Sequence, residues 1–171
     1  QDAAALAGER LAAIEAAPVA ALEPARAQPR FRRDVAMLRL VRAIAAMDVD
    51  PSAAAMELAD VARLLDGLSD GIDRDWLAVL RLMTHASAFR LALADDARRA
   101  PHRDAMLAAL DALAVGSGSS SRPPFPDLAH LVTRVLDRVE VLRADLPSDE
   151  GESLGASIAK VRLRLEGIPE E

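Results

Sequence analysis

Residues 127–146, DLAHLVTRVLDRVEVLRADL, carry the clearest structural signal in this 171-residue chain. Its apolar residues recur every three or four positions. This spacing places them on one face of an α-helix and leaves the charged residues on the other faces. The segment therefore predicts an amphipathic helix over about residues 127–145, with its apolar face covered by neighbouring helices. That face consists of Leu128, Leu131, Val132, Val135, Val139, Leu142 and Leu146.

The same helical spacing extends outward from this segment through most of the chain. No stretch shows the strict alternation of apolar and polar residues that is typical of a strand. The sequence thus predicts an all-α fold, an antiparallel multi-helix bundle of about seven helices. The other helices are expected at about residues 3–17, 31–47, 51 to a turn at 66–71, 74–94, 101–115 and 153–166.

The chain length suits a single domain, so residues 1–171 are expected to form one helical domain. The segment GSGSSSRPPFP, residues 116–126, is expected to be a flexible loop within it. Asp50 before Pro51 predicts a helix N-cap, and Pro101 predicts the first residue of the fifth helix.

Apolar spacing also predicts the buried face of the other helices. The helix at 31–47 is expected to bury Val35, Leu38, Val41 and Ala45. The helices that begin near residues 51, 74 and 153 are expected to bury, in that order, Leu58, Val61, Leu65 and Leu68; Trp76, Leu80, Met83 and Phe89; and Leu154, Ile158, Val161 and Leu165.

Composition argues against several function classes. The 27 acidic and 21 basic residues give a net charge of −6 and are interleaved along most helices, which disfavours nucleic-acid binding. Aromatic residues make up only 2% of the chain, so stacking platforms for bases are not expected. The chain has no cysteine, which excludes disulfides and thiolate chemistry. No apolar run approaches the length of a membrane span, and QDAAALAGER lacks the features of a signal peptide.

The histidines do not form a recognisable metal or catalytic motif. His85, His102 and His130 fall on three different predicted helices, and none has a second histidine at helical spacing. Asp127 and His130, one turn apart, are interpreted as a surface or capping pair. His85, among apolar neighbours, is expected to be a core histidine hydrogen-bonded to the backbone.

The remaining motif searches also predict no catalytic, cofactor or metal site. The carboxylates of Asp66, Asp70, Asp73 and Asp75 match no register of a calcium-binding loop, so a turn and a helix cap are expected there. The chain has no Glu-x-x-His motif of the di-iron bundles, and its serines and glycines match no nucleophile elbow or phosphate loop.

One group of arginines is a candidate interaction patch. Arg26, Arg30, Arg32 and Arg33 precede the first nearby acid, Asp34, and form a local concentration of positive charge. Such a patch can contact anionic lipid headgroups or an acidic protein surface. The alternative is a solvated connector beside the start of a helix.

The segment from residue 8 to residue 42 resembles the FUSC family of bacterial aromatic-acid and fusaric-acid efflux proteins. The family's soluble region begins with a Leu-x-x-Ile-Glu helix, then an acidic-Pro step, then a basic pair that opens a long helix. The matching positions are Leu11, Ile14, Glu15, Glu23, Pro24, Arg32 and Arg33. The chain departs from the family at Ala16–Ala20 and at Leu22, where the family has an Arg-Ser-Tyr-like stretch and an aromatic residue.

The resemblance implies a soluble helical domain of an inner-membrane exporter, on the cytoplasmic side. It implies a non-enzymatic role in assembly or regulation and, as partners, other copies or the transmembrane part of the same transporter. A homo-oligomer, with possible contact to the membrane surface, is expected. Two alternatives stay open: an independent cytoplasmic ligand-binding or protein-interaction bundle, and an enzyme built from scattered Arg, Asp and His residues.

Overall fold

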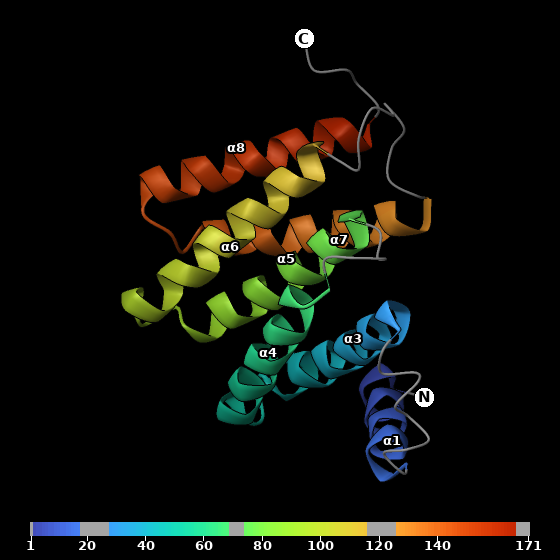
Figure 1. The fold of residues 1–171 in the computed structure, drawn as a ribbon. Helices are drawn as coiled ribbons and strands as arrows, with labels where there is room; N and C mark the ends of the chain where they lie inside the picture. Colours follow the sequence, from blue (N-terminus) through green and yellow to red (C-terminus); the bar gives the residue numbers. More distant parts are fainter. Residues whose placement is uncertain (1, 18–27, 69–73, 116–125, 167–171) are drawn as a thin grey trace. The chain divides into compact units, whose positions relative to one another are not determined.

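The fold is all-α, as the sequence predicts. The computed structural model describes residues 2–17, 28–68, 74–115 and 126–166, and every regular element in these ranges is a helix (Figure 1). The described helices group into two compact units, residues 1–72 and residues 73–171, called unit 1 and unit 2 here. The predictions of a single domain and of an overall antiparallel arrangement stay predictions. The predicted loop at 116–126 lies outside the described residues, except for its last residue, which opens a helix.

Unit 1 contains three described helices, α1 (Ala3–Ala16), α3 (Pro29–Ala46) and α4 (Pro51–Asp66). Helices α1 and α4 each pack against α3. Two N-caps explain where helices begin: Asp2 Oδ1 accepts a hydrogen bond from Ala4 N at 3.1 Å, and Asp50 Oδ1 accepts one from Ala53 N at 2.9 Å. The predicted cap at Asp50 is therefore confirmed.

The buried face of α3 differs from the predicted one. Ala36, Leu40 and Ala43 are buried, whereas Ala45 is exposed and the other three predicted residues are only half-buried. The expected face was wrong because it followed the β-branched and larger residues, while the closest packing is made through alanines, which let two helices approach each other. In α4, all four predicted residues are buried, as expected.

Ion pairs join α3 to α4 across their exposed side. Arg42 Nε donates to Glu57 Oε2 at 2.8 Å, and a second guanidinium nitrogen contacts the other carboxylate oxygen. One turn away, Arg39 Nη1 lies 3.4 Å from Asp60 Oδ2. These pairs cover the edge of an interface whose interior is apolar.

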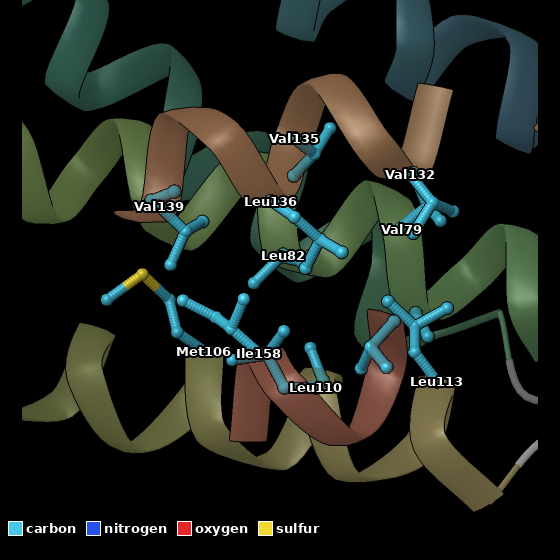
Figure 2. Close-up of a cluster of buried hydrophobic side chains, with 14 of the residues drawn as sticks. Val79, Leu82, Met106, Leu110, Leu113, Val132, Val135, Leu136, Val139 and Ile158 are labelled. Carbon is cyan, nitrogen blue, oxygen red and sulfur yellow. The ribbon is translucent and has the colours of Figure 1, made fainter. Parts of the chain in front are cut away.

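Unit 2 is a four-helix bundle. Its helices are α5 (Arg74–Leu91), α6 (Asp96–Val115), α7 (Pro126–Arg143) and α8 (Ser148–Leu165). The main packing pairs are α5 with α6, α6 with α8, α8 with α7 and α7 with α5, which closes a ring around one core. Figure 2 shows side chains meeting there, among them Leu82 of α5, Leu110 of α6, Leu136 of α7 and Ile158 of α8.

The predicted apolar face of α7 is confirmed. Five of its residues are buried, and Leu131 and Leu146 pack against the core while partly buried. Leu136 is fully buried as well, although the predicted stripe leaves it out. The apolar face of α7 is thus wider than a single row of residues, since α5 and α8 cover it from two sides.

Two helix starts differ from prediction. Helix α6 begins at Asp96, five residues before Pro101, because Asp95 Oδ1 accepts hydrogen bonds from the backbone amides of Ala97 and Arg98 at 3.1 and 3.2 Å. Pro101 therefore lies inside the helix. Helix α8 begins at Ser148 directly after Pro147, not near residue 153. No described helix is long and apolar enough to cross a membrane.

Candidate functional site: a histidine pair between two helices

The structure brings together two histidines that the sequence placed apart. His85 of α5 and His102 of α6 face each other, with their Nδ1 atoms 3.3 Å apart. The ring centroids lie 5.5 Å apart and the ring planes are tilted by 35°. The rings therefore meet nearly end to end, and both side chains are half-buried.

Helix geometry explains why these two side chains meet. The turn between α5 and α6 runs from Ala92 to Asp95, and the two helices pack against each other. His85 is seven residues before Ala92, and His102 is seven residues after Asp95. Positions at equal separation from a tight turn between packed helices lie opposite each other.

The contact between the two rings requires one proton between their Nδ1 atoms. An Nδ1···Nδ1 separation of 3.3 Å joins one ring that donates its Nδ1–H to another ring that accepts. Burial lowers the pKa of His102, which favours its neutral form.

Charged side chains near the pair are compensated by neighbours. Arg98 and Arg99 lie one turn before His102, and they pair with Asp95 and Asp96 at 3.2 and 2.7 Å. Arg99 also donates to the backbone carbonyl of residue 93 at 3.3 Å, and its guanidinium lies 6.0 Å from the ring centre of residue 89. Both arginines are thus held by partners in the turn before α6 and at its start.

The sequence did not predict the contact between the two histidines. The structure gives His85 a side-chain partner from another helix, and the expected hydrogen bond to the backbone stays a prediction. Because His85 and His102 are equally far from the turn, their contact could have been predicted from the sequence, but only if α6 had been predicted to start at Asp96. With α6 predicted to start at Pro101, His102 fell in its first turn. His130 is exposed on α7, and the side chain of its predicted partner Asp127 lies outside the described residues.

The predicted arginine patch is only partly described. Arg26 lies outside the described residues, and Arg30 is exposed at the start of α3. Arg33 pairs with its neighbour Asp34 at 2.6 Å. The guanidinium of Arg32 covers Gly67 at the end of α4, so closely that a Cβ on Gly67 would lie 2.6 Å from Arg32 Nη2. Two arginines of the patch are therefore engaged within unit 1, and the role of the patch as an interaction surface stays a prediction.

One residue of the predicted acidic cluster has a structural role in unit 2. The carboxylate of Asp75, only 5% exposed, accepts from Arg164 Nη2 at 3.1 Å and from Arg164 Nη1 at 3.3 Å. Arg164 also donates to the backbone carbonyl of Leu113 at the end of α6. Asp70 and Asp73 lie outside the described residues. This buried pair links α5, α6 and α8.

Among the described residues, no group of three or more His, Cys, Asp or Glu side chains is close enough to hold a metal ion. The histidine pair is thus the one place in the described part of unit 2 where two imidazoles converge. Comparison with protein-family models, curated proteins and solved structures finds no match to this chain.

Proposed function

We propose that this chain is a non-enzymatic helical domain of a bacterial inner-membrane efflux transporter, and that it acts in assembly or regulation. The proposal starts from the resemblance of residues 8–42 to the FUSC family. In that family the corresponding segment leads into a soluble helical region. The domain would assemble with other copies or with the membrane part of the same transporter.

One observation carries the proposal: the two described ends of the resembling segment, in α1 and α3, pack against each other. Leu11, a matching position, is 1% exposed in α1, which packs against α3. Ile14 is half-buried on the same helix, and Glu15 is exposed. A segment that only connects two regions has no need to bury a leucine completely, whereas an entry helix of a domain does. Glu23 and Pro24 lie outside the described residues.

Exposed apolar side chains also support a role in assembly. Val49 and Met56 in unit 1 are 86% and 68% exposed, and Val141 in unit 2 is 70% exposed. Single exposed apolar residues are ordinary on any surface. The three exposed side chains are available for apolar contacts with other subunits.

The test is made on the complete gene product. Its reading frame should encode membrane spans next to this segment, and the tagged protein should remain in the inner-membrane fraction after carbonate extraction. A complete reading frame without spans, together with a fully extractable protein, would refute the transporter proposal. An independent ligand-binding or protein-interaction bundle would then be the better interpretation.

A matched pair of variants tests the role of α1 within that protein. Leu11→Arg should reduce crosslinked oligomers and resistance to aromatic acids, because it places a charge in the core of unit 1. Ala13→Arg adds the same charge at an exposed position of α1 and should leave both unchanged. Equal effects of the two variants would argue against a specific role for the packed face of α1.

A further inference from the structure

We propose that two copies of this chain associate through the exposed face of α8, with the two α8 helices antiparallel and Glu152 of each copy paired with Lys160 of the other. The proposal adds a surface and a partner to the assembly role proposed above, and its biological meaning rests on that role. Its evidence comes from unit 2 alone. Its test uses the isolated chain, so it can fail or succeed whether or not the gene encodes membrane spans.

Helix α8 has one face in the core and one face in solvent. Leu154, Ile158 and Val161 are buried on the core side. With 3.6 residues per turn, the exposed residues on the opposite side fall within about 120° of the helix circumference. They are Asp149, Glu152, Ser153, Ala156, Ala159, Lys160 and Leu163.

The charges that flank this face are paired within unit 2, whereas the charges on the face are placed for a partner outside it. On one flank, Arg162 lies 3.2 Å from a carboxylate of α7, and on the other flank Glu150 contacts an arginine of α6. Neither Glu152 nor Lys160 has an oppositely charged residue three or four positions away on α8, so neither can form an ion pair along its own helix.

The order of charges makes the face complementary to a second copy of itself. Glu152 lies four residues before Ala156, and Lys160 lies four residues after it. A two-fold axis at Ala156 sets the two helices antiparallel and brings each Glu152 level with Lys160 of the partner. Both ion pairs then form together, and the positive patch of one copy meets the negative patch of the other.

The side chains at the centre of the face let two such helices come close. Ser153, Ala156 and Ala159 are small, and helices in contact through small residues have axes about 8 Å apart. The longer side chains of Glu152 and Lys160 can span that distance on either side of the centre. The antiparallel arrangement also places the positive end of each helix dipole beside the negative end of the other.

The first measurement is sedimentation velocity of the full chain over a range of concentrations. Contact through one helix per copy makes a small interface, so we expect a reversible dimer that forms as the concentration rises. A chain that stays monomeric up to its limit of solubility would overturn the proposal and leave this face to a different protein.

The second measurement maps the contact without any variant. Lys160 is the only lysine of the chain, so a zero-length carbodiimide crosslinker has a single side-chain amine to join to a carboxylate. Within one chain, Glu152 and Lys160 lie about 12 Å apart along α8, too far for a direct link. A Glu152–Lys160 crosslink found by mass spectrometry in the dimer therefore joins two copies. Crosslinks of Lys160 to carboxylates outside the α8 face would overturn the proposal.

Charge reversal provides the third test. Glu152→Lys and Lys160→Glu each set like charges opposite each other at both ends of the contact, so each should raise the dimer dissociation constant by about tenfold or more. The double variant Glu152→Lys/Lys160→Glu restores both pairs and should restore the dimer. Arg138→Glu, the matched control, reverses an exposed charge on α7 and should leave the dimer unchanged. Failure of the double variant to recover, or an equal loss in the control, would refute the proposed pairing.

Discussion

Removing the carboxylate of Asp75 should destabilise unit 2 more than removing any solvent-exposed charged group. The side chain is 5% exposed and pairs with Arg164, which is itself only 18% exposed. Asp75→Ala would leave the guanidinium of Arg164, which is largely shielded from water, without a carboxylate to balance its charge. Breaking a buried pair in this way costs about 3–5 kcal/mol of unfolding free energy.

The assay is urea unfolding followed by the fluorescence of Trp76, the single tryptophan, which packs against the core of unit 2. With a slope of about 1–3 kcal/mol/M, the midpoint should fall by about 1–5 M. The matched control is Asp137→Ala, which removes an exposed carboxylate from its pair with Arg162 at 3.2 Å. Its cost should lie within about 0.2–1 kcal/mol.

A double variant separates pairing from packing. In Asp75→Ala/Arg164→Met, the unpaired charge is gone, so the loss of stability should be smaller than the sum of the two single losses. If Asp75→Ala and Asp137→Ala shift the midpoint equally, the burial of the Asp75 pair does not matter energetically and the reasoning is refuted. Simple additivity in the double variant would show that the two side chains act independently.

Three further predictions concern other parts of the chain. Gly8→Ala should stabilise unit 1 by about 0.5–1 kcal/mol in thermal unfolding, because Gly8 lies inside α1 with no atom within 4 Å of an added Cβ; a loss of stability would contradict this. Arg42→Ala should lower the unfolding free energy of unit 1 by about 1 kcal/mol more than Arg63→Ala does. The reason is that the carboxylate that Arg42 contacts is largely buried, whereas Arg63 is 78% exposed. Equal losses of stability in the two variants would contradict this. Burial lowers the pKa of His102, so the unfolded chain takes up a proton there more readily than the folded one. In EDTA, the stability of unit 2 should therefore be unaffected by this group above about pH 7 and fall as the pH drops below about 6.5, with a shallower fall in His102→Gln.

The amphipathic character of the helices could be predicted from the sequence. Which residues form the buried face of a helix could be predicted only where large apolar residues mark that face. In α7, leucine and valine mark the core side, and the prediction is confirmed. In α3, alanines at positions 36 and 43 are fully buried beside Leu40, and alanine spacing carries no such signal in a chain this rich in alanine. The face that packs closest is decided by its partner helix, which local periodicity does not contain.

The candidate site could not be predicted because it depends on a boundary. Pro101 resembles a helix start, since proline is favoured at the first helical position. The N-cap at Asp95 begins the helix earlier, and only with that start do His85 and His102 lie opposite each other. The ion pair of Asp75 with Arg164 joins residues 89 positions apart, and no local pattern indicates such a partner.

The position of Pro101 inside α6 has a consequence for how that helix opens. Proline has no backbone N–H, so the carbonyl of residue 97 loses its usual partner four residues on. Residues 96–100 are therefore tied to the rest of the helix by one bond fewer, and we expect their amide hydrogens to exchange with solvent as a separate, faster group. Met106, fully buried one turn after His102, holds the following part of the helix to the core. The first turn of α6 is thus expected to open more readily than the part of the helix that follows His102.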